Sequence, residues 1–135
     1  MMIRVLDASV VVKWFVPEDE PSTRKACAIL DEVLLSTKGF AVPELLYSEC
    51  LHVFGKRLSR QDDIDWAMSQ LFRLAITPLR FDAAVARAAA RALAAGLTGY
   101  DATYYAFAEQ LGGKWVTFDR SAWDRAPDKN VVDLL

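Results

Sequence analysis

Short apolar runs alternate along the chain with longer stripes of apolar residues. The runs are typical of buried strands and cover residues 2–6, 40–42, 76–79, 114–117 and 130–134. The stripes place apolar residues three or four positions apart, as on one face of a helix. They predict helices over residues 21–37, 43–58 and 100–111, and one more after a capping-box-like sequence at residues 59–62. Residues 81–95 are predicted to be helical for another reason, since nine of the fifteen are alanine, the strongest helix former. Strands that alternate with helices indicate an α/β fold, in which a parallel sheet is covered on both faces.

Two segments carry weaker patterns. Residues 9–16 admit two interpretations, because three consecutive valines favour a strand whereas the length and the stop at Pro17 suit a buried helix. Residues 120–128 are interpreted as an irregular loop. The predicted alternation of strands and helices in the rest of the chain is the same whether residues 9–16 form a strand or a helix.

Composition limits the class of protein. The length of 135 residues suits a single domain over residues 1–135. Hydrophobic residues make up 53% and charged residues 25%, so the chain is not disordered. The longest apolar run, residues 3–16, is interrupted by charges and is too short to span a membrane. No signal peptide is recognisable, and Cys27 and Cys50 lie in apolar helical patterns, so we expect a cytoplasmic protein with reduced thiols.

The net charge is −2, from 16 basic and 18 acidic residues. This balance argues against a protein that grips nucleic acid over a broad basic face. It is compatible with an enzyme that handles a phosphodiester at one metal site. If several carboxylates were grouped around a metal, the rest of the protein would be mildly basic.

Two acidic residues follow strands. Asp7 comes after the run at 2–6, and Asp119 lies just beyond the run at 114–117. Ligands of parallel sheets bind beyond the carboxyl ends of the strands, so both side chains are candidates for a site. Each also has a purely structural explanation, since Asp is a favoured N-cap of a following helix. Position alone leaves both interpretations open.

Two more acids, Glu49 and Asp101, interrupt apolar helix faces. Glu49 lies three residues after Leu46, within a stripe where Glu is rarely buried without a partner. Asp101 lies three residues before Tyr104, on the inner side of its helix. The alternative for Asp101 is a capping box with Thr98.

Together the four acids indicate a metal site. Several carboxylates close together disfavour one another's ionisation, and a hard cation such as Mg²⁺, which takes oxygen ligands, removes that repulsion. Such an ion can activate water and stabilise charge on a phosphodiester. The chain has no G-x-S-x-G sequence and no P-loop. Glu49 and His52 have the Glu-x-x-His spacing of di-iron bundles, but that architecture needs the motif twice and His52 is the only histidine. His52 is therefore interpreted as a partly exposed helix residue.

Four segments carry a resemblance to a known family: VLDASVVVKW at residues 5–14, PELLYSE at 43–49, YDATYYA at 100–106 and VTFD at 116–119. In their order and spacing they resemble PIN-domain ribonucleases, in particular the VapC-type toxins of prokaryotic toxin–antitoxin pairs. The resemblance extends over nearly the whole chain. It implies a PIN-like three-layer fold, with a five-stranded parallel sheet flanked by helices. It also implies a Mg²⁺- or Mn²⁺-dependent endoribonuclease that hydrolyses RNA, forms a homodimer and is bound by a small antitoxin protein.

The resemblance also assigns roles to particular residues. It implies four catalytic, metal-binding acids and two supporting hydroxyls: Asp7, Glu49, Asp101 and Asp119, with Ser9 and Thr117. Phe118 is bulkier than the small residue expected before Asp119, and Asp124, five residues further on, is the reserve for the fourth acid. Lys13 is either a possible RNA contact or a lysine that extends along the surface.

Other functions stay open at this point. A phosphatase with Asp7 as its nucleophile would need a second Asp two residues later, where this chain has Ser9. A non-catalytic PIN-like binding module would not need all four acids, and the chain has them. The type of nucleic acid is also open, because the same metal chemistry can cut DNA.

Overall fold

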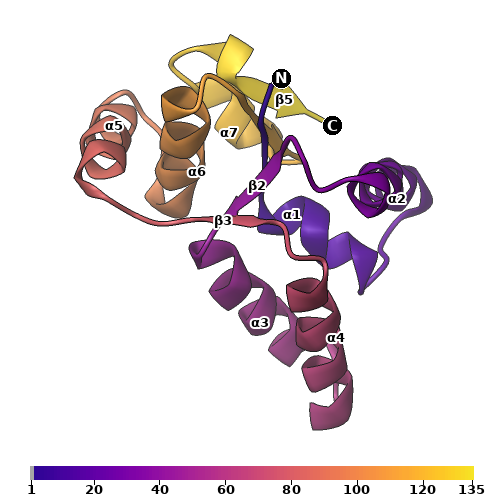
Figure 1. The fold of residues 1–135 in the computed structure, drawn as a ribbon. Coiled ribbons are helices and arrows are strands. Elements are labelled where there is room, and N and C mark those ends of the chain that lie inside the picture. The colour runs from indigo at the N-terminus through magenta and orange to yellow at the C-terminus, as the bar shows by residue number, and fades with distance from the viewer. Residues whose placement is uncertain (1) are drawn as a thin grey trace.

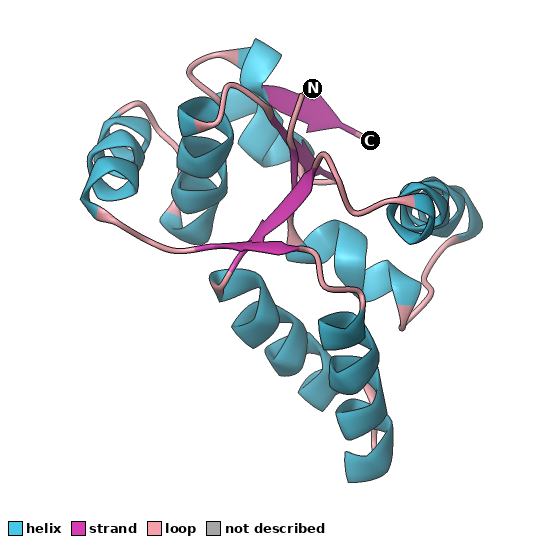
Figure 2. Cartoon of the chain, viewed as in Figure 1, coloured by secondary structure: helices cyan, strands magenta, loops and turns pink. Residues whose placement is uncertain are grey.

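The fold is a parallel sheet with helices on both faces (Figures 1 and 2). The structure is a computed structural model that describes residues 2–135. The strands lie in the order β3-β2-β1-β4-β5, and every neighbouring pair is parallel. Their bounds are β1 Arg4–Leu6, β2 Phe40–Pro43, β3 Thr77–Leu79, β4 Lys114–Thr117 and β5 Val132–Leu134. The predicted α/β class and five-stranded parallel sheet are confirmed.

Successive residues of the central strands point to opposite faces of the sheet. Leu6 and Val116 belong to the core on one face, whereas Val5 and Trp115 belong to the core on the other. Helices from the first half of the chain cover the first core: α1 Ala8–Val11, α2 Glu20–Leu35, α3 Leu45–Arg57 and α4 Gln61–Arg73. Later helices cover the second core: α5 Ala83–Ala94, α6 Gly99–Gln110 and α7 Arg120–Arg125. Two short 3₁₀ helices complete the fold: η1 Val12–Trp14 and η2 Lys129–Val131.

The ambiguous segment at residues 9–16 is helical over most of its length, since α1 runs directly into η1. Asp7 caps α1, and its side chain accepts a hydrogen bond from the backbone N–H of Ser9 at 2.9 Å. Val10 and Val11 are completely buried in the first core. Burial against the sheet therefore outweighs the preference of valine for strands.

Two local predictions are wrong. The loop expected over residues 120–128 contains α7, which begins after Asp119 because the Asp119 carboxylate caps it by accepting a hydrogen bond from Ala122 N–H at 3.0 Å. The capping box expected at residues 59–62 does not form, since Arg60 is the N-cap of α4 and makes no side-chain capping bond. The helix nevertheless begins at Gln61, so the apolar stripe predicted the element without the cap.

Gly113 lets β4 begin directly beside β1. A Cβ atom at this position would collide with the carbonyl oxygen of Ile3, so no other residue fits without moving the backbone. The same carbonyl accepts a hydrogen bond from Lys114 N–H at 2.9 Å. This close approach sets the register in which Leu6 lies opposite Val116, so that β1 and β4 end side by side.

The structure also bears on the composition-based expectations. Within residues 2–135, every helix falls short of the length and apolar character that crossing a bilayer requires. Both cysteines are free thiols, with Cys27 half-buried on α2 and Cys50 buried on α3. Burial raises the pKa of the Cys50 thiol, which keeps it in the neutral form.

Candidate active site

The structure brings the four predicted acids to the carboxyl-terminal edge of β1 and β4. Asp7 directly follows β1, and Asp119 lies in the turn after β4. Glu49 comes from α3, and Asp101 from the first turn of α6. The charges of Asp119, Asp7 and Glu49 all act on the Asp101 carboxyl, so the four side chains share one region of the molecule. Capping and membership of this acid group are compatible roles for both Asp7 and Asp119.

Asp7 is the most buried of these acids, with 6% of the residue exposed. Its Oδ1 accepts hydrogen bonds from the Ser9 N–H at 2.9 Å and the Ser9 hydroxyl at 2.5 Å. Its Oδ2 accepts a hydrogen bond from the Trp115 indole N–H at 2.9 Å. Burial raises the pKa of Asp7, and the hydrogen bonds, that of the Ser9 hydroxyl foremost, oppose the rise. Trp115 was not among the predicted residues, although a tryptophan in a buried strand must find an acceptor for its N–H.

Hydroxyl groups connect the two acids at the strand ends. The Ser9 Oγ accepts a hydrogen bond from Phe118 N–H at 3.1 Å and lies 3.5 Å from the Thr117 Oγ1. The Thr117 Oγ1 in turn accepts a hydrogen bond from Asp119 N–H at 3.1 Å. This chain of contacts runs from Asp7 to the backbone of Asp119. The supporting role that the resemblance implies for both hydroxyls stays a prediction.

Glu49 is held by a second aromatic residue, Tyr104, which is not among the predicted site residues. The Tyr104 hydroxyl donates a hydrogen bond to Glu49 Oε1 at 2.5 Å. Burial raises the pKa of Glu49, the hydrogen bond from Tyr104 opposes this, and the charge of Asp7 adds to the rise. The Tyr104 ring stacks on Trp115, with ring centroids 6.1 Å apart and planes 10° apart. One stacked pair of aromatic donors thus orients two of the acids.

Asp101 carries the clearest electrostatic signature of a shared site. Burial raises its pKa most, and the charges of Asp119, Asp7 and Glu49 raise it further, to about 6. The capping-box alternative is not formed, because the Thr98 side chain makes no capping hydrogen bond to α6. Burial and like-charge repulsion together are typical of functional carboxylates.

The structure distinguishes Asp119 from Asp124, the alternative candidate for the fourth acid. Asp119 is half-buried and belongs among the acids whose charges act on Asp101. Asp124 lies within α7 and is exposed. The placement therefore favours Asp119 as the fourth member of the acid group.

Lys13 is not the surface lysine of the second interpretation, because only 8% of the residue is exposed. Its ammonium group donates a hydrogen bond to the Ser9 carbonyl oxygen at 2.9 Å. The buried lysine side chain therefore contacts the segment that carries Asp7. Its role as an RNA contact stays a prediction. His52 is exposed on α3, as expected.

The chemistry of the four acids fits a hard divalent cation. All four offer carboxylate oxygens, and their mutual repulsion is the condition that a cation relieves. As the side chains stand, no three acidic, histidine or cysteine residues within 2–135 are gathered closely enough to hold a metal ion. This is compatible with Mg²⁺, which keeps several waters and is usually bound through one or two carboxylates rather than by a closed protein cage.

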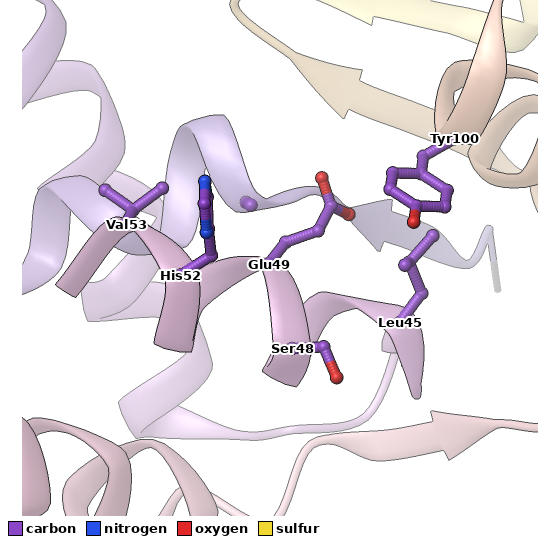
Figure 3. Close-up of a pocket in the computed structure, with 7 residues that line it drawn as sticks. Leu45, Ser48, Glu49, His52, Val53 and Tyr100 are labelled. Atoms are coloured by element: carbon purple, nitrogen blue, oxygen red, sulfur yellow. The ribbon is translucent and has the colours of Figure 1, made fainter. Parts of the chain in front are cut away.

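A cavity of about 430 Å³ adjoins the acid group (Figure 3). Glu49 forms part of its wall, and in Figure 3 the Glu49 carboxylate lies between His52 on one side and Tyr100 on the other. The cavity is bounded by α1, α3 and the start of α6. Glu49 is the acid of the group that lines the cavity, and the lining residues Ala8 and Tyr100 are the chain neighbours of Asp7 and Asp101.

Comparison with known proteins identifies the class. The model of the PIN domain family matches residues 4–129. Ribonuclease VapC3 of Pyrobaculum aerophilum is 32% identical over 125 residues, which cover 91% of this chain and 94% of that protein. The solved structure of FitAcB from Neisseria gonorrhoeae is similar with a TM-score of 0.76 at 17% identity, and the match covers 98% of this chain and 97% of that one. A toxin–antitoxin complex from Klebsiella pneumoniae is similar with a TM-score of 0.67 at 16% identity, covering 96% and 95%.

The chain belongs to the PIN domain family. Within that family its sequence is of the VapC type, as its match to ribonuclease VapC3 along nearly the whole length shows.

Proposed function

We propose that this protein is a Mg²⁺-dependent endoribonuclease, the toxin of a type II toxin–antitoxin pair, with Mn²⁺ as an alternative ion. The observation that carries the proposal is the placement of four carboxylates in one region at the carboxyl ends of β1 and β4, where the charges of Asp119, Asp7 and Glu49 raise the pKa of Asp101. The identity of 32% to a protein named as a ribonuclease supports RNA as the substrate.

In this proposal Asp7, Asp101 and Asp119 hold the ion, directly or through water, and Glu49 completes the group. A divalent ion, when bound, supplies an activated water and neutralises charge on the phosphate oxygens. The protein needs no nucleophile of its own, so no covalent enzyme intermediate forms. This is hydrolysis of an RNA phosphodiester by in-line attack of water on phosphorus.

The neighbouring residues keep the carboxylates in place. Ser9 and Trp115 occupy both oxygens of Asp7 with hydrogen bonds, which prevents the side chain from rotating. Tyr104 holds Oε1 of Glu49, which leaves Oε2 as the atom that would accept a hydrogen bond from the attacking water. Positioning of this kind removes reorganisation from the reaction and favours the transition state.

The proposal extends to partners. A structure similar in fold is described as a toxin–antitoxin complex, and by likeness we propose that a small antitoxin protein binds this chain and that the chain forms a homodimer in the cytoplasm. A short open reading frame just upstream of the gene would support the pairing. The mass of the purified protein, measured by light scattering after gel filtration, tests the dimer.

The activity is tested by incubating the purified protein with a mixed RNA pool in Mg²⁺, in Mn²⁺ and in chelator, beside an Asp7→Asn control. We expect cleavage in either ion, none in chelator and none with the variant. Cleavage of single-stranded DNA but not of RNA would replace the substrate. Absence of any cleavage, with RNA still bound, would identify a non-catalytic binding module instead.

A further inference from the structure

The cavity of about 430 Å³ is tied to the acid group by the chain itself. Glu49 belongs to both, and two other lining residues are direct neighbours of acids. Ala8 follows Asp7, and Tyr100 precedes Asp101. A phosphodiester at the acids would therefore place the adjoining nucleotide at the mouth of this cavity.

The lining suits a flat, neutral group. Leu45 and Val53 supply aliphatic surface, Tyr100 an aromatic ring and His52 a polar edge, while the lining residues include no lysine or arginine. A cavity without strong cations does not suit a phosphate, but a nucleobase has apolar faces and a polar rim. The volume lies in the range of small-molecule sites.

Tyr100 is the residue best placed to bind a base. It is 61% exposed, so its ring is not covered by other side chains. Figure 3 shows the ring on the opposite side of the Glu49 carboxylate from His52. Proteins that bind single-stranded RNA commonly stack unpaired bases on aromatic side chains and read the base edges through hydrogen bonds.

We propose that this cavity is a nucleobase subsite, in which the base next to the scissile phosphate stacks on Tyr100 while His52 contacts its edge. The inference rests on the proposed function, because the phosphodiester at the acids brings the base to the cavity. The subsite gives the enzyme a means of selecting the nucleotide at the cleavage position, which the acids alone do not provide.

The test measures binding of a short single-stranded oligoribonucleotide to Tyr100→Ala and Tyr100→Phe, each combined with Asp119→Asn to stop turnover. Tyr100→Ala should weaken binding by about 5- to 150-fold, the loss expected for one base stacked on an aromatic ring. Tyr100→Phe keeps the ring, so the double variant should bind RNA within about 2-fold of the Asp119→Asn single variant. Phe81→Ala is the matched control, because Phe81 is equally exposed at 61% but lies outside the cavity.

A series of oligoribonucleotides with one abasic position each identifies the base. At one position the loss of the base and the loss of the Tyr100 ring should not add, since each removes the same contact. Additive losses at every position, or a Tyr100→Ala variant that binds like Phe81→Ala, would overturn the subsite while leaving the nuclease intact. If the parent protein neither binds nor cleaves RNA, the proposed function fails, and the subsite with it.

Discussion

The ammonium group of Lys13 lies 4.3 Å from the centroid of the Phe118 ring. The lysine that follows three valines and the bulky residue before Asp119 thus form one cation–π contact. The Ser9 carbonyl oxygen also binds Lys13, and the Ser9 hydroxyl binds the backbone N–H of Phe118. The contact therefore joins the helical segment after Asp7 to the turn that carries Asp119.

This contact predicts an energetic coupling between the two side chains. Phe118→Leu should destabilise the parent protein by about 1 to 2 kcal/mol, because the buried ammonium loses its ring. In a Lys13→Met background the same change should cost less, with a coupling of about 0.5 to 2 kcal/mol. Urea unfolding of the four proteins measures it. Purely additive effects, together with RNA binding that falls in Lys13→Met, would instead make Lys13 an RNA contact.

Asp101→Asn and Asp7→Asn should change metal-free stability in opposite directions. Asp101→Asn removes a repelled carboxylate and should stabilise the protein by about 1 kcal/mol, since solvent screens part of the repulsion. Asp7→Asn replaces one acceptor oxygen by an NH₂ donor, which then faces either the Trp115 N–H or the Ser9 donors. This substitution should lower the free energy of unfolding by about 1 to 3 kcal/mol. Chemical unfolding in chelator gives both values. A loss of stability in Asp101→Asn would argue that its carboxylate serves the helix terminus and not the acid group.

Added Mg²⁺ should stabilise the parent more than Asp101→Asn. An ion that binds only the folded state stabilises by about 2.7 kcal/mol at a concentration 100-fold above its Kd. Thermal melts across a Mg²⁺ titration measure this shift, and Asp124→Asn provides a control of similar chemistry outside the acid group. Equal shifts in all three proteins would indicate that the ion binds elsewhere.

Asp119→Asn should abolish cleavage, whereas Asp124→Asn should stay within about 2-fold of the parent. Asp119 lies among the acids and Asp124 is exposed on α7. Asn is as good an N-cap as Asp, so Asp119→Asn should still cap α7 and melt close to the parent temperature. Initial rates on one RNA substrate at saturating Mg²⁺ compare the two. The reverse order of activities would move the fourth acid to Asp124.

Metal-free stability should fall as the pH rises through the window from about 4 to about 6. The pKa of Asp101 rises from 3.8 to about 6 on folding, mainly through burial and then through Asp119, Asp7 and Glu49. In this window the folded protein holds more protons than the unfolded chain, so raising the pH favours unfolding. Asp101→Asn lacks this contribution, so its advantage over the parent should grow between pH 4 and pH 7. Melts of both proteins in chelator test the sign.

Local sequence signals predicted the elements and their order. Helix α2 follows from apolar spacing, α5 from its alanine content, and strands such as β1 and β4 from short apolar runs, because all three signals act within a few residues. The acids on these elements were identifiable for the same reason: Glu49 and Asp101 break a local pattern, and Asp7 and Asp119 follow strands. The resemblance of four short segments then supplied the sheet and the metal-site roles, of which the sheet is confirmed and the roles stay predictions.

Tertiary structure decided which side chains serve those acids. Trp115 reaches Asp7 across 108 residues of chain, and Tyr104 reaches Glu49 across 55. These contacts depend on the pairing register of β1 and β4 and on the packing of α6 against the sheet, neither of which leaves a periodic trace in the sequence. The burial of Lys13 against Phe118 has the same origin. Local propensity and periodicity determine the elements, whereas the partners of a buried polar group are determined only when distant elements meet.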